Sequence, residues 1–138
     1  MNVKKVGNVI LAVNDLERSV EFYNKILGMP IKNIRSNWVD LGQSGALLSL
    51  HPALKSEPHS GTSVDNGILI GLVVGDVESA VNELKSKNVK IHRDIQEREA
   101  GINAIIEKIG KIEGIQNTET FVELQKTYKE PVYLTKNL

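Results

Sequence analysis

Residues 6–28, V-G-N-V-I-L-A-V-N-D-L-E-R-S-V-E-F-Y-N-K-I-L-G, decide the fold of this chain. Apolar residues fill Val9–Val13, a pattern typical of a strand that is covered on both faces. Asn14 or Asp15 then provides a helix N-cap, and Glu17 follows Asn14 at the spacing of a capping box. The spacing of the next apolar residues predicts one helical stripe, made by Leu16, Val20, Tyr23 and Leu27. The last glycine of the stretch supplies the helix stop.

The same pattern returns in residues 67–89. Asp76 takes the place of Asp15 and begins a helix predicted over Asp76–Lys87. The same offset in sequence matches further strand and helix positions: Leu11 with Leu72, Val13 with Val74, Glu17 with Glu78, and Val20 with Val81. The predicted buried face of the second helix is Val77, Ala80, Val81 and Leu84. Because strand, cap and stripe agree in register, the sequence indicates an internal repeat.

Strands fill most of the remaining sequence between residues 31 and 95. Ile31–Ser36 predicts a strand, and Asn37–Gly42 and Ala46–Leu50 form a predicted hairpin around glycine and serine turn residues. Ile68–Val74 and Val89–Ile95 are the strands on either side of the second helix. The first half therefore reads as a strand, a helix and three strands.

The last third leaves two interpretations open. In one, Ile102–Glu107 is a strand, residues 108–118 form an enlarged turn, and Glu119–Lys126 closes the sheet. In the other, Ile102–Glu113 is a helix and Thr118–Lys126 is the closing strand. The isoleucines of this stretch recur at helical spacings, which favours the helix slightly.

The chain has 138 residues and suits a single domain over residues 1–138. Within it we expect module one at 6–50, a linker at 51–66, module two at 67–126 and a tail at 127–138. Seventeen basic and seventeen acidic residues cancel, which argues against a nucleic-acid or membrane partner. The absence of cysteine fits a reducing cytoplasm, and no apolar run reaches transmembrane length.

Two segments carry a family resemblance: N-V-I-L-A-V-N-D-L-E-R-S-V-E-F-Y-N-K-I-L-G-M and G-L-V-V-G-D-V-E-S-A-V-N-E-L-K-S-K-N-V. They resemble the vicinal oxygen chelate superfamily, which includes glyoxalase I, extradiol dioxygenases, fosfomycin-resistance enzymes and bleomycin-resistance proteins. The resemblance implies the α+β class, with two strand-helix-strand-strand-strand modules forming a curved mixed sheet around a cavity. The second module would be modified if the helix of the last third is real. It also implies a homodimer.

A second, weaker similarity concerns the stretch A-I-I-E-K-I-G-K-I-E-G-I-Q-N-T-E-T-F-V-E-L. It resembles the end of the ligand-binding domain of Lrp/AsnC-type regulators. No helix-turn-helix module precedes it, so a DNA-binding regulator is not implied.

The superfamily resemblance also locates the usual metal ligands. In its metal-using members, a histidine lies seven residues before the aspartate that starts each helix, and here these positions hold Asn8 and Leu69. A glutamate near the end of the first module is replaced by Ser49, whereas the last-strand glutamate corresponds to Glu123. We therefore expect no metal and no other cofactor. The three histidines show no ligand-like spacing: His51, His59 and His92.

Five residues are predicted to contact a small-molecule ligand: Asn8, Arg35, Trp38, Ser49 and Glu123. Trp38 could stack on a ligand, Arg35 could pair with a carboxylate or phosphate, and Glu123 could have a raised pKa if it is buried. For each, an ordinary core or surface role is the alternative.

The function expected from the resemblance is metal-independent binding of a small molecule, of the glyoxalase/bleomycin-resistance type. One alternative is a divalent-metal-dependent lyase, isomerase or dioxygenase of the same superfamily. Another is a non-catalytic scaffold or regulatory subunit. The sequence leaves open whether the protein is an enzyme.

Overall fold

The computed structural model describes four ranges of the chain: residues 1–54, 67–98, 101–106 and 122–127. The chain forms two compact units. The first unit is Val6–Ile70, and the second unit combines Met1–Lys5 with Gly71–Leu138. The predicted division into modules, linker and tail stays a prediction.

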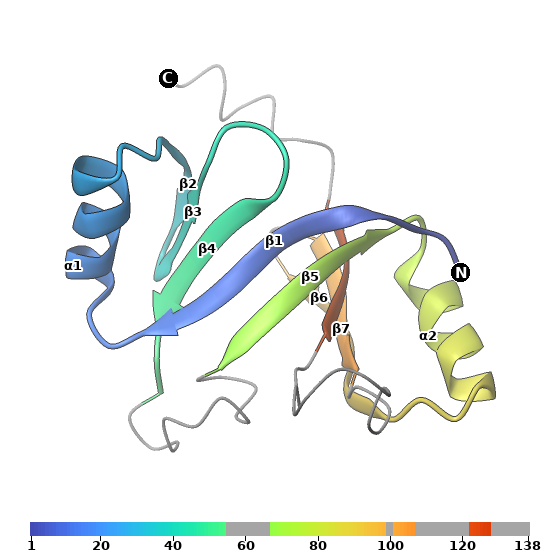
Figure 1. Cartoon of the computed structure of the whole chain (residues 1–138). Helices are drawn as coiled ribbons and strands as arrows, with labels where there is room; N and C mark the ends of the chain where they lie inside the picture. Colours follow the sequence, from blue (N-terminus) through green and yellow to red (C-terminus); the bar gives the residue numbers. More distant parts are fainter. Residues whose placement is uncertain (55–66, 99–100, 107–121, 128–138) are drawn as a thin grey trace, which may run out of the picture. The chain divides into compact units, whose positions relative to one another are not determined.

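The first unit holds a helix and four strands in the order predicted (Figure 1). The elements are β1 (Val3–Val13), α1 (Leu16–Glu21), the π-helical turn η1 (Phe22–Ile26), β2 (Ile31–Arg35), β3 (Trp38–Leu41) and β4 (Leu47–Pro52). The strand order is β2-β3-β4-β1. Strands β2, β3 and β4 pair antiparallel, and β4 pairs parallel to β1.

The second unit repeats this order of elements. They are β5 (Ile68–Val74), α2 (Val77–Ser86), β6 (Ile91–Arg98), β7 (Gly101–Ile106) and β8 (Val122–Thr127). The boundary between the units falls within β1, after Lys5, and within β5, after Ile70. The strand order is β5-β8-β7-β6, with antiparallel pairing of β6 to β7 and of β7 to β8. The prediction of an α+β fold built from two strand-helix-strand-strand-strand modules is confirmed.

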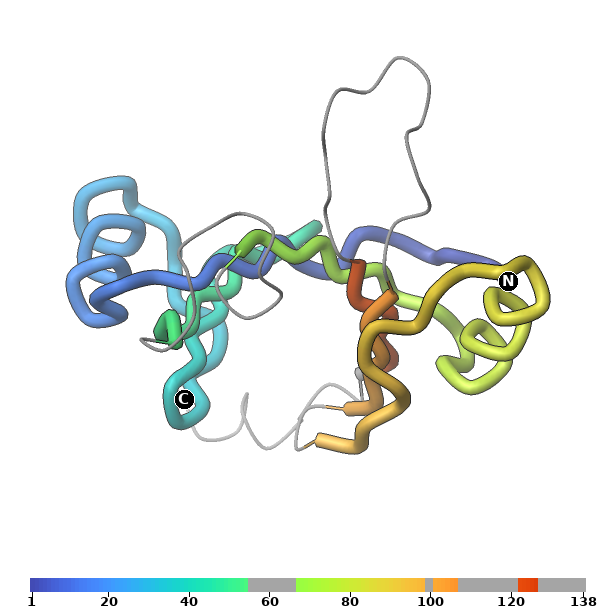
Figure 2. The backbone as a smooth tube through the Cα atoms, turned by 90° about the horizontal axis from the view of Figure 1, so that it is seen from below, coloured from blue at the N-terminus to red at the C-terminus, as the bar shows by residue number. Residues whose placement is uncertain are grey.

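Helix α1 covers one face of the sheet in the first unit (Figure 2). Successive residues of a strand point to opposite faces, so Val39 and Leu41 of β3 share a face. Both are buried with Leu50 of β4, and the apolar side of the helix packs against this cluster. The helical residues in this core are Leu16, Val20 and Tyr23. The opposite face of the same strands is therefore left to other side chains.

The predicted stripe of the first helix is right for Leu16, Val20 and Tyr23 and wrong for Leu27. The amide of Leu27 donates to the carbonyl of Phe22 at 3.0 Å, which is the hydrogen bond of a π-helix. This wider turn rotates the following residues, so that Leu27 is 56% exposed while Met29 packs on the core. Gly28, between them, has φ of +80°, which only glycine adopts readily.

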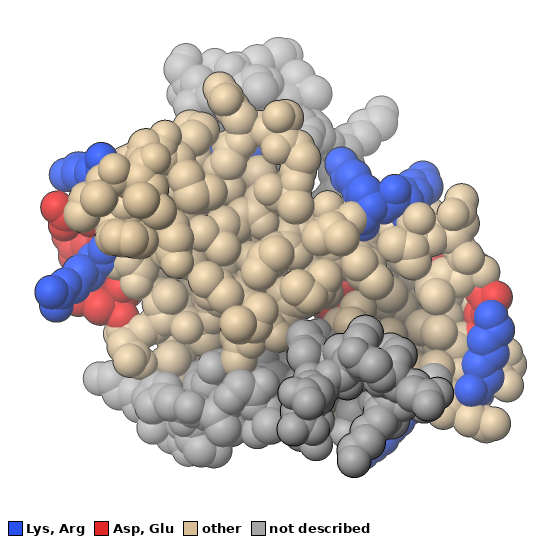
Figure 3. Space-filling view, in the orientation of Figure 1, with Lys and Arg blue, Asp and Glu red and all other residues tan. Residues whose placement is uncertain are grey.

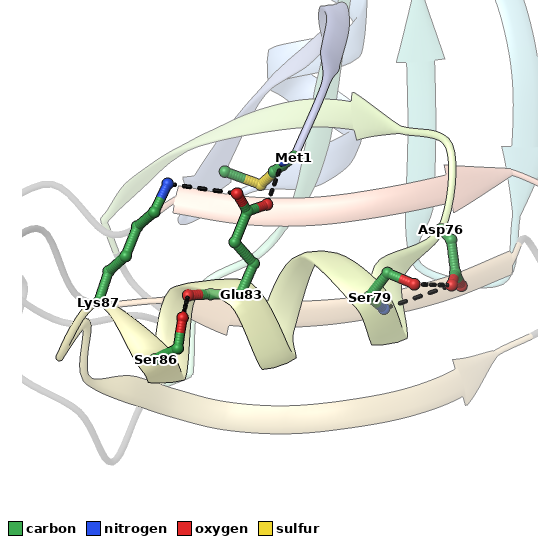
Figure 4. Close-up of polar contacts among 6 residues, drawn as sticks. All are labelled: Met1, Asp76, Ser79, Glu83, Ser86 and Lys87. Atoms are coloured by element: carbon green, nitrogen blue, oxygen red, sulfur yellow. Dashed lines mark hydrogen bonds and ion pairs between the residues drawn. The ribbon is translucent and has the colours of Figure 1, made fainter.

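Both helices begin at an aspartate, as the repeat predicts. The side chains of Asp15 and Asp76 each accept a hydrogen bond from the backbone N–H three residues on; Figure 4 shows Asp76 with Ser79. The side-chain hydrogen bond from Ser79 lowers the pKa of Asp76. Because Asp15 and not Asn14 is the N-cap, Glu17 stands one position too early for a capping box.

The predicted buried face of the second helix is confirmed. Its buried residues are Val77, Ala80, Val81 and Leu84. They pack with Val74, Val89, Ala104 and Leu124. This core holds α2 against one face of strands β6, β7 and β8.

The slight preference for a helix from Ile102 is wrong where the structure describes the chain. Residues Gly101–Ile106 form β7, which pairs with β6 on one side and β8 on the other. Adjacent Ala104 and Ile105 point to opposite faces and both are buried, so the strand is apolar without alternation. For this reason, the spacing of its isoleucines resembles that of a helical stripe. The rest of the predicted helix, the enlarged turn, the first residues of the closing strand and the predicted tail after Thr127 lie outside the described residues.

The outer surfaces of the helices carry charges of both signs. Acidic and basic side chains lie together along α1 at the left of Figure 3. On α2, Glu83 pairs with the amino group of Met1 and with Lys87, whose Nζ lies 3.2 Å from Oε1 (Figure 4). Exposed pairs of this kind contribute little to stability.

In the described ranges, neither helix has the length and apolar character that crossing a membrane requires.

Candidate functional site

Polar side chains gather on the face of the first unit that α1 does not cover, which we call the helix-free face. Strand register places them together, because Asp40 pairs with Ser49 on β4 and with Asn33 on β2. Arg35 likewise pairs with Trp38. Seven polar or aromatic residues have this orientation: Asn8, Asn33, Arg35, Trp38, Asp40, Ser49 and His51.

Asp40 is the centre of this group, and only 4% of its surface is exposed. Its Oδ1 accepts hydrogen bonds from the indole Nε1–H of Trp38 at 2.8 Å and from the hydroxyl of Ser49 at 2.6 Å. Its Oδ2 accepts from the amide of Asn33 at 3.2 Å and from the guanidinium of Arg35 at 3.4 Å. A carboxylate offers about four lone-pair directions, so these donors satisfy it. Buried polar groups in folded proteins are expected to be paired in this way.

The network continues from Asp40 onto β1. Ser49 is fully buried, and while its hydroxyl donates to Asp40 its oxygen accepts from the side-chain amide of Asn8 at 2.9 Å. Asn8, Ser49 and Asp40 therefore form a chain of donors and acceptors across three strands. Such a chain fixes the orientation of each side chain in it.

Trp38 and His51 form a flat stacked pair beside this network. Their ring centroids are 5.5 Å apart and the rings are nearly parallel, at 8°. Nδ1 of His51 lies 3.1 Å from the carbonyl oxygen of Pro52. A carbonyl only accepts, so Nδ1 is the donor in this hydrogen bond. Both rings are half-buried. The indole is thus held at its N–H by Asp40 and at one face by the imidazole.

Glu123 lies in the second unit, on β8, where it pairs with Ile105 of β7. Burial raises the pKa of Glu123 from its ordinary value of 4.5 to about 7, and the charges of Arg98 and Arg93 offset only part of this. The expectation of a raised pKa at this position is confirmed. At neutral pH such a carboxyl is close to half protonated.

The structure brings four of the five predicted ligand residues into one hydrogen-bond network: Arg35, Trp38 and Ser49 donate to Asp40, and Asn8 joins through Ser49. Sequence reasoning missed Asp40 itself, and it placed His51 in or beside a linker although the residue belongs to β4. An aspartate between two apolar residues, opposite a serine in the predicted hairpin, was the available signal. His59 lies outside the described residues.

A sequence model of the Glyoxalase/Bleomycin resistance protein/Dioxygenase superfamily matches residues 5–109. The chain belongs to this superfamily. The match covers the helix-free face of the first unit and most of the described second unit. A comparison with curated protein sequences gave no match.

Solved structures of the superfamily fold resemble the chain at low sequence identity. Methylmalonyl-CoA epimerase from Mycobacterium tuberculosis has a TM-score of 0.68 and 21% identity, over 91% of this chain and 89% of that one. A variant of the Streptomyces coelicolor methylmalonyl-CoA epimerase, in complex with 2-nitronate-propionyl-CoA, has a TM-score of 0.68 and 16% identity, over 93% and 97%. The hypothetical protein BH1468 from Bacillus halodurans has a TM-score of 0.67 and 15% identity, over 91% and 96%. At these identities the likeness concerns the fold.

Three of the four side chains at the metal positions implied by the superfamily resemblance do not fit a divalent ion, and Glu123 is the fourth. Asn8 uses its amide N–H and Ser49 uses its hydroxyl in the network around Asp40, and Leu69 is a buried apolar residue. Divalent ions prefer carboxylate and imidazole ligands at such sites. In the described part of the chain, no group of three or more histidine, aspartate and glutamate side chains is arranged to hold a metal.

Proposed function

We propose that this protein is a metal-independent, small-molecule-binding member of its superfamily, and that the ligand binds on the helix-free face of the first unit. The observation that carries the proposal is the saturation of the Asp40 carboxylate by four donors from three strands. A buried hub of this kind fixes Trp38 and Arg35 before any ligand arrives, and fixed contact groups lose little entropy on binding. The protein would act by sequestering its ligand.

The stacked pair of Trp38 and His51 favours a ligand with a flat apolar part. An indole ring gives a large contact area at small entropic cost and prefers offset or edge contacts with other rings. The surrounding polar side chains would then orient the ligand. That the protein is a homodimer in the cytoplasm stays a prediction.

The test is a thermal-shift screen of purified protein in the presence of a chelator. The panel contains glycopeptide antibiotics, simple aromatic compounds and small oxo-acids. A ligand well above its dissociation constant should raise the melting temperature without any divalent metal. The Trp38→Leu variant should lose this shift, whereas Phe22→Leu, which changes an exposed ring on η1, should keep it. Stabilisation that appears only after metal is added, or that survives in Trp38→Leu, would contradict the proposal.

Glu123 supports a second candidate, an enzyme of the same superfamily that moves a proton. A carboxyl with a pKa of about 7 is well matched to accept a proton from carbon near neutral pH. Two of the similar structures described above are methylmalonyl-CoA epimerases, so methylmalonyl-CoA is the substrate to test. Exchange of its α-proton in deuterated buffer, followed by NMR, should occur with the native protein and stop in Glu123→Gln. No exchange above the uncatalysed rate would eliminate this candidate.

A further inference from the structure

We propose that the helix-free face selects ligands that carry a carboxylate or phosphate beside their flat part, and that Arg35 binds this anionic group. The inference rests on the proposed binding function and adds the chemical class of the ligand. It is carried by the position, exposure and incomplete pairing of Arg35 relative to Asp40 and Trp38.

The Arg35 guanidinium has donors to spare. It contacts Asp40 through one terminal nitrogen, at 3.4 Å, although a guanidinium carries five N–H groups. Its side chain is 30% exposed, and in the described ranges Asp40 is its acidic partner. The planar fork of arginine suits a carboxylate or phosphate that approaches from the solvent side.

The ion pair with Asp40 leaves part of the Arg35 guanidinium available to a ligand. Three uncharged donors already stabilise that carboxylate, from Trp38, Ser49 and Asn33, and two of them are at 2.8 Å or closer. The carboxyl side chain is only 6% exposed, so a ligand on this face meets the cation and not the anion. The accessible charge of the site is therefore positive.

Strand register places this charge next to the flat surface. Arg35 of β2 and Trp38 of β3 are paired residues, and directly opposite residues of antiparallel strands have side chains about 5 Å apart on one face. One small molecule can therefore place a ring on the indole and an anionic group on the guanidinium at the same time.

A matched pair of probes tests the inference, and the single tryptophan of the chain reports the binding. The probes are 4-nitrobenzoate and 4-nitrobenzamide, which have the same ring and differ in charge. Quenching of Trp38 fluorescence is titrated with each at pH 7.5 with a chelator present, and corrected for inner-filter absorption. The native protein should bind the carboxylate about 10-fold tighter than the amide, which is the range expected for a partly exposed charged hydrogen bond.

Substitutions test whether Arg35 causes the preference for the carboxylate probe over the amide probe. Arg35→Gln should bring the two dissociation constants to about the same value, and Arg35→Lys should retain part of the preference. Lys32→Gln, which removes an exposed cation from the same strand, is the control and should keep the native ratio. Equal binding of both probes by the native protein would overturn the inference and leave the proposed function standing. A failure of both probes to quench Trp38 would count against the inference and the proposed function together.

Discussion

Asp40 is the residue on which the proposed site depends, because a buried carboxylate is stable only where donors replace water. Four side chains from three strands perform this role: Asn33, Arg35, Trp38 and Ser49. Removal of the carboxylate would leave the indole N–H and the serine hydroxyl without their acceptor. The cost of such a change comes mainly from these orphaned groups.

Asp40→Ala should therefore lower the free energy of unfolding by roughly 2–4 kcal/mol. The measurement is urea denaturation followed by Trp38 fluorescence and by circular dichroism. Asp94→Ala is the control, because that side chain is 69% exposed and should cost about 0.5 kcal/mol or less. Equal effects of the two changes would mean that Asp40 is not a structural hub.

The raised pKa of Glu123 leads to a second prediction, which concerns how the stability of the fold depends on pH. Its pKa is about 7 in the folded protein and near its ordinary 4.5 when the chain is unfolded. The folded state therefore holds this proton more strongly, and its stabilising contribution is present below pH 4.5 and is lost as the pH rises through 7. Replacement by the neutral Glu123→Gln should remove this part of the pH dependence.

In numbers, Glu123→Gln should be more stable than the native protein at pH 8.5 by about 3 kcal/mol and similar to it at pH 4.5. Denaturation midpoints at the two pH values measure this difference. Glu21→Gln, at an exposed position on α1, should follow the native curve. A native protein that is as stable at pH 8.5 as Glu123→Gln would show that the carboxylate is not buried.

Among the helices and strands, the sequence predicted the element types better than their ends. The first helix was expected from its stripe, but the stripe assumes about 3.6 residues per turn and therefore could not reveal the wider π-helical turn η1, which leaves Leu27 exposed. For β7, the sequence left open the type of the element itself. Its apolar residues face two covered sides, so periodicity alone could not separate a buried strand from a helix.

The sequence allowed either Asn14 or Asp15 as the N-cap of α1, and the structure has Asp15 in this position. This assignment can be tested by substitution. Asp15→Ala should cost about 1 kcal/mol of unfolding free energy, because its carboxylate accepts the N–H of Arg18 at 3.0 Å. Asn14→Ala should change stability by less than about 0.5 kcal/mol, since surface changes away from such a cap are nearly neutral. A larger loss in Asn14→Ala than in Asp15→Ala would reverse the assignment of the cap.

At the scale of the whole molecule, the repeat was the most informative feature of the sequence. Asp15 and Asp76 proved to be equivalent caps, and both units have the same order of strand, helix and three strands. The site was only partly predictable. Asn8 and Ser49 could be selected because the superfamily resemblance marks their positions. Asp40 required the register of three neighbouring strands, which the sequence does not state.

The proposed function requires that a small molecule bind at Trp38 without a divalent metal. The chain has one tryptophan, so its indole N–H gives a single resonance in a proton–nitrogen correlation spectrum, and this N–H is the group bonded to Asp40. The most direct measurement follows that resonance while a ligand from the thermal-shift screen is added to chelator-treated protein. Binding at Trp38 should produce a saturable shift with the same dissociation constant as calorimetry gives. An indole resonance that stays in place while calorimetry reports binding, or binding that begins only when a divalent ion is restored, would contradict it.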